Sequence, residues 1–584
     1  MKMNSQKNDA VPNRPTHDSY KDGITLASEM GEPPERSRGT AKKVVDNILL
    51  GIVVTLALVC LALLTPFLAF CAVLQRVKVG RLRFREPPSK QRIAVIGGGW
   101  SGLQCAAELR ELGVHQIKCF ERNDGLGGTW HPALRYYKLQ IHGCLWAMTF
   151  KDLPFSTCRD INDGKASGEL VQDFLNKVGE YKNLTDYYAF NAEVVEVEQR
   201  EHSQAKSREA MLVVKNTQTG ELRSEGPFDL VVFASMAAKP RIPQLPGREK
   251  FKGKIYHSSE FKEEQFNDIV TNRQRAVVVG GNKSACDLAL CLQRGGYDNF
   301  HWIYRNPYLF WKYEVACHNR SLLNKLRALT NFIGVFLTLV SEPLSWWIFF
   351  TTGTAVTAAP HDDTPPPRDW SKFHFGVLCP KQRSDLLSIP KEHISRGNPQ
   401  AFTKTGIMLS DGTVVDADVV LFGTGYDSGI SNLRLTKGGG EHGKQSSSTR
   451  IGPETTMLDH FIVSDFPVLA NASTLMTTWG TLRGVNVAQM AVYHLCVRPF
   501  LSETEARCSA ERQLFQSSGE TALLFDGKTS SIKAILLIHL DLIKRGHVNL
   551  LDSIWHMFEF FVLNHQTPLK MHLPPLRSSI RKYA

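Results

Sequence analysis

The longest apolar run of the chain extends from Ile48 to Leu74 and contains no charged residue. About 20 apolar residues in a helix cross the hydrocarbon core of a bilayer, so residues 47–75 are predicted to form a transmembrane helix. A signal peptide fits this run less well, because the run begins far from Met1 and is longer than an h-region. Residues 1–46 are polar, rich in Pro, Ser and charge, and lack hydrophobic periodicity, which predicts a disordered tail.

Basic residues are denser after this run than before it. Between residues 76 and 92 the chain has seven Lys and Arg residues against a single acid, Glu86, whereas the basic residues before the run are balanced by acids. The flank richer in Lys and Arg stays in the cytoplasm. We therefore expect a single-pass membrane protein whose remaining chain lies in the cytosol, with the basic flank against anionic membrane lipid.

Two later segments have apolar patterns with more than one interpretation. An apolar insert at residues 330–360 is interrupted by Glu342 and Pro343. It is therefore a helical hairpin at the membrane interface, a lid over an apolar substrate entrance, or a pair of buried helices. Residues 501–584 include apolar positions at helical spacing, which predicts a helical extension that packs on the core or lies on the membrane.

A strand, a glycine-rich turn and a helix follow one another at the start of the globular region. Arg92–Ile96 is β-branched and apolar, and Leu103–Leu112 has a helical pattern. The turn between them has the spacing G-x-G-x-x-G, which predicts a dinucleotide site with the pyrophosphate at the helix N-terminus. Its residues are Gly97, Gly98, Gly99, Trp100, Ser101 and Gly102. The next strand ends in Glu121, an acid that suits a ribose hydroxyl and repels a 2′-phosphate, so this site should take FAD or NAD.

A second unit of the same kind begins with the strand Arg275–Val279. Asn282 replaces the second glycine of the turn and Ala285 the third, and Asn tolerates positive φ better than most residues. The following strand ends in Arg305, whose guanidinium suits a 2′-phosphate, so this site should prefer NADPH. A purely structural unit without a ligand stays open as the alternative. The residues assigned to this site are Gly280, Asn282, Lys283, Ser284, Ala285, Asp287 and Arg305.

The two units repeat one plan. Each closes with an acid, Asp229 or Asp418, followed by an apolar strand and a turn of small residues. The fold class is therefore predicted to be α/β, with two Rossmann-like dinucleotide-binding domains. The second domain is expected to be inserted in the first. The expected order is the first part of the FAD domain at 90–236, the NADPH domain at 237–400, and the second part of the FAD domain at 401–500.

Composition narrows the possible partners. A chain of 584 residues with 42% apolar content can form several domains around large cores. The net charge of +12 is compatible with nucleic acid or anionic lipid, but no nucleic-acid motif is present, so nucleic acid is not an expected partner. The 12 cysteines are scattered without a C-x-x-C pair or zinc spacing, which indicates reduced, buried thiols and no metal site. Nothing in the sequence indicates an oligomeric state.

Between the two units, residues 251–261 fit the pattern F-x-G-x-x-x-H-x-x-x-[FY]. This pattern resembles the signature of the flavin-containing and N-hydroxylating monooxygenases. The stretch from Glu121 to Trp130 and the late Gly-Thr-Gly-Tyr turn are also similar to that family, and the resemblance covers about residues 90–500. Phe261 and Lys262 differ from the Baeyer–Villiger relatives, which usually have Trp followed by Pro or Asp.

The resemblance implies FAD and NADPH as cofactors and an N- or S-oxygenation of a soft nucleophilic or lipophilic substrate. In that family NADPH reduces FAD, and O2 then forms a C4a-hydroperoxide. The family also implies an endoplasmic reticulum membrane. It adds cofactor-contacting positions at Arg122, Gly128, Thr129, Trp130, His257, Gly423, Thr424 and Gly425. His257 looks like a residue that couples the two domains rather than a general base.

One departure concerns the flavin itself. His142 stands where animal members of the family place an Asn beside the flavin C4a, so His142 is the candidate catalytic residue. An imidazole can also donate a hydrogen bond there. Two alternative functions stay open: a membrane-bound flavin and NADPH sensor without turnover, and Baeyer–Villiger oxygenation of ketones. A flavin disulfide reductase is disfavoured, because no cysteine pair follows the first unit.

Overall fold

The computed structural model describes the following residues: 86–141, 149–150, 153–154, 166–202, 207–235, 237–305, 309–312, 355–357, 373–378, 380–428, 432–438, 448–449, 451, 455–458, 461–472, 483–497 and 511–512. The predicted tail, the predicted membrane helix and His142 lie outside these residues, as do most of the insert at 330–360 and of the extension at 501–584. Within the described residues, no helix has the length and apolar character needed to cross a membrane.

The first sheet contains five parallel strands in the order β27-β9-β1-β2-β5. Their bounds are β1 Arg92–Ile96, β2 Gln116–Phe120, β5 Tyr188–Ala189, β9 Leu230–Phe233 and β27 Leu469–Asn471. Antiparallel strands extend the β27 edge: β26 Ile462–Val463, β25 Thr456–Leu458 and β28 Glu511–Arg512. This is the strand order of a Rossmann-type sheet, the predicted class of fold, with the first glycine turn after the central strand β1.

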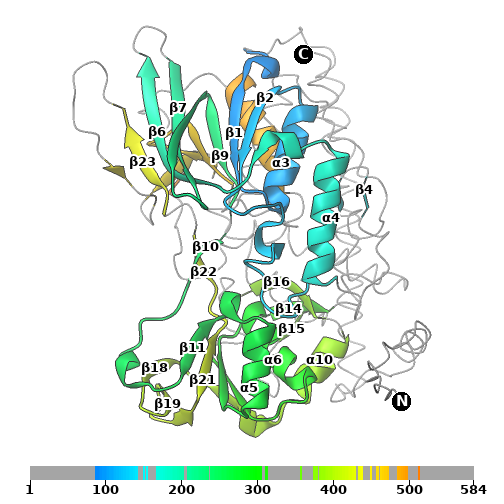
Figure 1. The fold of residues 1–584 in the computed structure, drawn as a ribbon, viewed down its shortest axis with the longest axis vertical. Coiled ribbons are helices and arrows are strands. Elements are labelled where there is room, and N and C mark those ends of the chain that lie inside the picture. The colour runs from blue at the N-terminus through cyan, green and yellow to red at the C-terminus, as the bar shows by residue number, and fades with distance from the viewer. Residues whose placement is uncertain are drawn as a thin grey trace, which may run out of the picture. The chain divides into compact units, whose positions relative to one another are not determined.

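Both faces of this sheet are covered, as the alternation along β1 requires. Ile93 and Val95 face a core shared with three helices, α3 Trp100–Glu111, α4 Gly168–Tyr181 and α11 Arg483–Val492. Ala94 and Ile96 face a second, five-stranded sheet (Figure 1). The strands of that sheet are β6 Ala192–His202, β7 Ser207–Asn216, β8 Leu222–Phe228, β23 Arg434–Lys437 and β24 Ser448–Thr449.

A separate parallel sheet forms the second domain, in the order β11-β21-β12-β13-β17. Its strands are β11 Lys254–His257, β12 Ala276–Val279, β13 Phe300–Tyr304, β17 Ile394–Arg396 and β21 Val419–Phe422. One face packs on helices α5 Glu263–Thr271, α6 Lys283–Arg294 and α10 Pro380–Leu387. The other packs on a small antiparallel sheet of β18 Pro399–Phe402, β19 Gly406–Leu409 and β20 Val414–Asp416.

The second domain extends further along the chain than expected. The sequence analysis places residues 401–500 in the first domain, yet β18 to β21 all belong to the second. The chain passes from the first domain to the second through β10 (Ala237–Pro240) and returns through β22 (Tyr426–Ser428), and these two strands pair antiparallel. Short strands complete the described structure: β3 Thr149–Phe150, β4 Leu153–Pro154, β14 Leu309–Lys312, β15 Ala355–Thr357 and β16 Phe373–Leu378.

The predicted internal repeat extends to individual hydrogen bonds. The Arg92 backbone N–H donates to Asp229 at 2.7 Å, and its guanidinium Nη2 donates to the same carboxylate at 2.6 Å. Arg275 donates to Asp418 in the same two ways, both at 2.8 Å. In each domain the ion pair joins the start of the central strand to the start of a neighbouring strand. Each domain therefore has its own ion pair that fixes the register of these two strands.

Candidate functional site

The first glycine loop lies at the carboxyl edge of its sheet, directly after β1. Gly97 has φ +119°, a value that L side chains rarely adopt, and its N–H donates to the Phe120 carbonyl at 2.8 Å. A Cβ on Gly102 would lie 1.9 Å from the Gly97 carbonyl oxygen. Only glycine at position 102 therefore lets α3 begin this close to the strand, which is the role predicted for it.

The second glycine of the loop touches another backbone turn. A Cβ on Gly128 would lie 2.7 Å from the Gly99 Cα, and the Gly127 N–H donates to the Gly98 carbonyl at 3.0 Å. Gly128 opens the short 3₁₀ turn Gly128–Trp130, which holds the predicted flavin contacts Thr129 and Trp130. The structure thus brings the two predicted glycine segments together.

Glu121 lies at the end of β2 and is only 5% exposed. Its Oε2 accepts from the Gly98 N–H at 2.6 Å, and its Oε1 accepts from the Asn123 backbone and side-chain nitrogens at 2.9 and 2.7 Å. Each carboxylate oxygen can accept further bonds, so a ribose hydroxyl can still be bound. Asn123 was not predicted, although its position two residues after the acid fits a local side chain-to-backbone contact.

Two helices begin next to this loop. Gly99 is the N-cap of α3 and supplies no side chain to the first-turn N–H groups. Gly484, at the start of α11, packs so closely that its Cβ would lie 2.3 Å from the Ser101 carbonyl oxygen. Two positive helix ends are therefore close to the loop, which suits the phosphates of a dinucleotide. The contribution of α11 was missed, because the pairing of two helices far apart in sequence leaves no local pattern.

The second glycine loop follows β12 at the carboxyl edge of its own sheet. Gly280 has φ +138°, and its N–H donates to the Ile303 carbonyl at 2.9 Å, as Gly97 does in the first domain. Asn282 is the N-cap of α6, and its side-chain oxygen accepts from the Lys283 N–H at 2.7 Å. The departure from glycine therefore has a defined structural effect: one of the first-turn donors of α6 is already bonded.

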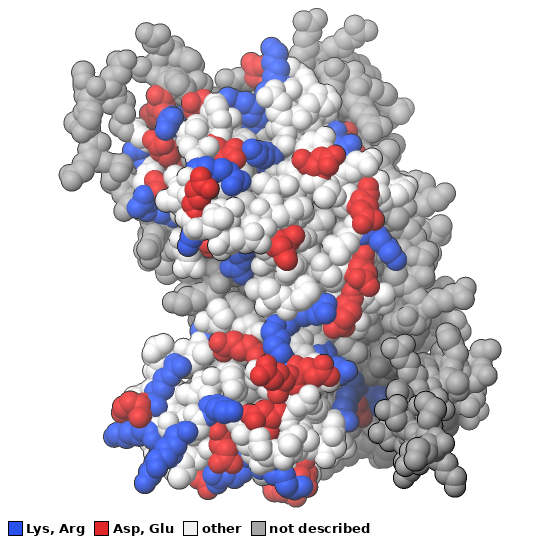
Figure 2. Space-filling model, viewed as in Figure 1, with Lys and Arg blue, Asp and Glu red and all other residues white. Residues whose placement is uncertain are grey.

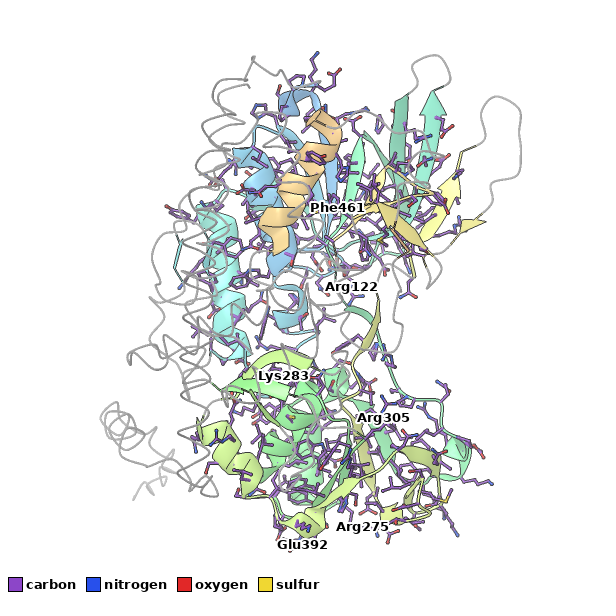
Figure 3. All side chains as sticks on the ribbon, turned by 180° about the vertical axis from the view of Figure 1, so that it is seen from behind. Arg122, Arg275, Lys283, Arg305, Glu392 and Phe461 are labelled. Atoms are coloured by element: carbon purple, nitrogen blue, oxygen red, sulfur yellow. The ribbon has the colours of Figure 1, made fainter. Side chains whose placement is uncertain are left out.

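The remaining residues assigned to the second site fall into two groups. Arg305 is exposed at the end of β13, and Figure 3 labels it in the second domain together with Lys283. Lys283 is 8% exposed and forms an ion pair with Asp287 one turn along α6. The late turn packs on the loop, since a Cβ on Gly423 would lie 2.5 Å from the Ala285 nitrogen. Thr424 donates to the Arg241 carbonyl.

Arg122 remains on the first domain, as Figure 3 labels it. Its side chain is partly buried, and its carbonyl accepts from the Thr217 hydroxyl at 3.0 Å. The backbone bond holds the segment after Glu121 in place.

His257 is fully buried and bonded at both ring nitrogens. The Ser259 N–H donates to Nδ1 at 3.2 Å, so the proton is on Nε2, which donates to the Gly425 carbonyl at 2.8 Å. Burial is the main influence on this imidazole and lowers its pKa. Both ring nitrogens of His257 are thus engaged by neighbouring backbone groups.

The other fixed positions of the F-x-G-x-x-x-H motif have packing roles. Phe251 packs on Phe402 with ring centroids 5.3 Å apart, and Phe261 is completely buried in the second-domain core. A Cβ on Gly253 would lie 2.3 Å from the Asp418 carbonyl oxygen. Gly253 therefore allows the chain before β11 to lie close to β21, and the two phenylalanines fix the flanks of this segment in the second-domain core.

The cysteines that the structure describes are free and buried, in agreement with the predicted reduced thiols: Cys105, Cys119, Cys286, Cys291 and Cys496. Burial raises the pKa of Cys119, Cys291 and Cys496 to about 12. These thiols are inert at neutral pH, which fits structural roles.

Comparison with known proteins agrees with this geometry. The family model for flavin-binding monooxygenase-like proteins matches residues 90–300. Flavin-containing monooxygenase 3 of Canis lupus familiaris is 25% identical over 58% of this chain and 62% of its own length. The FAD-dependent monooxygenase rstn6 of Aspergillus nomiae is 28% identical over 44% of this chain and 45% of its own length. The chain thus matches between about half and three fifths of these two curated relatives.

Solved structures share the fold at low identity. An oxidized steroid monooxygenase bound to NADP has a TM-score of 0.52 and 14% identity, covering 79% of this chain and 98% of its own. A closed structure of cyclohexanone monooxygenase has a TM-score of 0.51 with the same identity and coverage.

Two parallel sheets, each with a glycine loop at its carboxyl edge, define a protein with two Rossmann-type domains, as predicted. Within that class, residues 90–300 match the model of the flavin-binding monooxygenase-like family, in agreement with the resemblance found in the sequence.

Proposed function

We propose that the protein is an FAD- and NADPH-dependent monooxygenase that transfers one oxygen atom of O2 to a nucleophilic nitrogen or sulfur atom of a lipophilic substrate. The observation that carries this proposal is the difference between two equivalent positions. The residue directly after strand β2 of the first domain is the buried acid Glu121, whereas the residue directly after strand β13 of the second domain is the exposed Arg305. The first favours free ribose hydroxyls, and the second favours a 2′-phosphate.

The first site has the features that FAD requires. Gly99 and Gly128 keep side chains away from the point where the two turns meet, and the start of α3 offers N–H groups to a pyrophosphate. Thr129 and Trp130 follow directly and would border the flavin. Glu121 is held by three protein donors and would orient the adenosine ribose.

The second site would bind NADPH with fewer free backbone donors for the pyrophosphate than the first site offers to FAD. The Asn282 side chain occupies one donor at the start of α6, so the pyrophosphate would be bound by the remaining N–H groups of Ser284 and Ala285. Arg305 would bind the 2′-phosphate. His257 donates to the Gly425 carbonyl and so fixes the turn through which the chain leaves this domain.

Bound FAD and NADPH would supply the electron transfer and oxygen activation that amino-acid side chains lack. The polypeptide binds the two cofactors, orients them and excludes water from the reacting atoms. Its one candidate for direct chemistry is His142, whose imidazole we assign as a hydrogen-bond donor beside the flavin.

We further propose that residues 47–75 anchor the protein in the endoplasmic reticulum membrane, with the two domains in the cytosol and the basic flank after residue 75 against anionic lipid. An apolar insert at 330–360 would then admit lipophilic substrates near the membrane.

On the face drawn in Figure 2, acidic and basic residues are interspersed over the described surface. That distribution offers no continuous basic stripe on this face for nucleic acid.

The test uses the full chain purified in detergent with its flavin. NADPH oxidation is followed with a sulfide, an amine and a ketone, and the products are analysed after reaction under labelled O2. The proposal expects one labelled oxygen atom in the sulfide or amine product for each NADPH consumed. Oxygenation of the ketone alone would favour the Baeyer–Villiger alternative. A yellow protein whose flavin NADPH does not reduce would favour the sensor alternative.

A further inference from the structure

Six residues of the first domain, 132–137, are bonded to the second domain along their length. The Tyr137 N–H donates to the Phe261 carbonyl at 2.8 Å. The Lys262 ammonium donates to the carbonyls of Pro132 at 3.2 Å and Ala133 at 3.4 Å, and also to that of Arg135. This segment begins two residues after Trp130, so it connects the turn assigned to the flavin with the domain assigned to NADPH.

The most buried contact of this segment is made by Tyr136, which is 6% exposed. Its hydroxyl donates to the Asp287 Oδ2 at 2.6 Å. Asp287 is paired with Lys283 as well, and the two charged side chains are only 11% and 10% exposed. A tyrosine of the first domain therefore completes a buried ion pair at the start of α6.

Two protein donors, the Tyr136 hydroxyl and the Lys283 ammonium, are bonded to the same oxygen atom of Asp287, Oδ2. A buried ion pair is stable when further hydrogen bonds satisfy the charged atoms, and for Asp287 the Tyr136 hydroxyl is such a bond. The contact is made to Asp287, one turn along α6 from Lys283, next to the helix start where the pyrophosphate of NADPH would bind. Any change in the position of Tyr136 therefore changes the relation between the two cofactor sites.

We propose that Tyr136 is a positioning residue for hydride transfer: its bond to the Asp287–Lys283 pair holds the flavin-side turn in register with the start of α6. The proposal rests on the proposed function. It assigns to Asp287 a contact between the domains, and it gives Lys262 the same role at the other end of residues 132–137.

The expected decrease in the rate of flavin reduction follows from the geometry of hydride transfer. Reacting atoms must approach to roughly 3–3.5 Å, and a misplacement of about 1 Å from a remote mutation can cost about 100-fold in rate. We expect Tyr136→Phe to lower the limiting rate of flavin reduction by NADPH at least about tenfold, while FAD content and melting temperature stay close to those of the unmodified protein.

The matched control is Tyr297→Phe. Tyr297 is 5% exposed and its hydroxyl donates to the Gln274 carbonyl within the second domain, so this change removes a buried tyrosine hydroxyl without affecting residues 132–137. Anaerobic stopped-flow reduction at several NADPH concentrations separates the limiting rate from the NADPH affinity. If the loss of a buried tyrosine hydroxyl acts only through stability, both variants should keep the limiting rate of flavin reduction of the unmodified protein. A slower limiting rate in Tyr136→Phe alone therefore indicates a positioning role.

A second measurement does not depend on turnover. Amide hydrogen exchange of residues 132–137 should be faster in Tyr136→Phe than in Tyr297→Phe. If the unmodified protein is not reduced by NADPH, the proposed function fails, and equal exchange in the two variants would then overturn the contact as well. If the unmodified protein is reduced and Tyr136→Phe matches it within about twofold, the positioning role is wrong. If Tyr136→Phe does not accumulate, Lys262→Met must give the slow reduction for the proposal to stand.

Discussion

A methyl group at position 102 would separate the cofactor role of the first loop from its structural role. In Gly102→Ala the new Cβ would lie 1.9 Å from the Gly97 carbonyl oxygen. An ordinary carbon–oxygen contact is about 3.4 Å, so the start of α3 would have to move by the difference, about 1.5 Å. The obstacle is backbone, and no side-chain rotation relieves it.

Two effects of this change on stability oppose each other. Overpacking of this kind costs about 1–3 kcal/mol, whereas replacing a helical glycine by alanine favours the helix by about 1 kcal/mol. The net loss in the free energy of unfolding is therefore about 0–2 kcal/mol, and the protein still folds. The pyrophosphate bonds at the start of α3 would be displaced by the full shift, and losing two of them weakens FAD at least about 100-fold.

The assay is the ratio of flavin to protein after purification, together with the melting temperature. The matched control is Ala285→Gly, which restores the motif glycine at the equivalent position of the second loop, where the structure already accommodates a methyl group. We expect Gly102→Ala to be folded and colourless, and Ala285→Gly to retain its flavin. A folded Gly102→Ala protein with full flavin content would refute the assignment of FAD to this loop.

Three further changes test other parts of the structure. Arg305→Ser should raise the KM for NADPH about 10- to 100-fold with little change for NADH, measured by steady-state kinetics; equal effects on both would contradict the 2′-phosphate role. The Arg275 guanidinium holds the pKa of Asp418 below its usual 3.8, so the pair stabilises the fold above that pH and the contribution is lost as pH falls through the folded pKa. Because both side chains are 43% exposed, Asp418→Asn should cost about 0–1 kcal/mol at pH 7 in urea unfolding and nothing at strongly acid pH. Burial lowers the pKa of His257 below 6.5, so the stability that the neutral ring contributes is complete above pH 6.5 and is lost as pH falls through the folded pKa. In His257→Gln the free energy of unfolding, measured with urea between about pH 4 and 8, should therefore depend less on pH in the acid range. The same pH dependence in both proteins would contradict this role of His257.

Local patterns in the sequence predict the core of each domain well. The strands at Arg92–Ile96 and Ala276–Val279, and the glycine turns after them, were identified because short β-branched runs and glycine spacing are local signals. The boundary at residue 400 was misplaced for a physical reason. The strand Val419–Phe422 is buried on both faces and would suit the centre of either parallel sheet. Its sequence therefore does not say which sheet it joins.

The contacts between the two domains could not be predicted from the sequence, because they join residues that are far apart along the chain. Tyr136 and Asp287 are 151 residues apart, and nothing near Tyr136 distinguishes it from an ordinary core tyrosine. The sequence analysis assigned Asp287 to the second cofactor site. Its carboxylate is bonded to Tyr136 and Lys283, and only the folded arrangement reveals that partnership.

The pairing of β10 with β22 means that the chain crosses between the domains twice at one place. A segment whose two ends are already side by side can be exchanged as a cassette, because its host joins it at one paired stalk and has otherwise to match the contacts made by residues 132–137. A change of nicotinamide preference could then be acquired by grafting residues 241–425 from a relative, while the flavin-side sheet keeps its own packing.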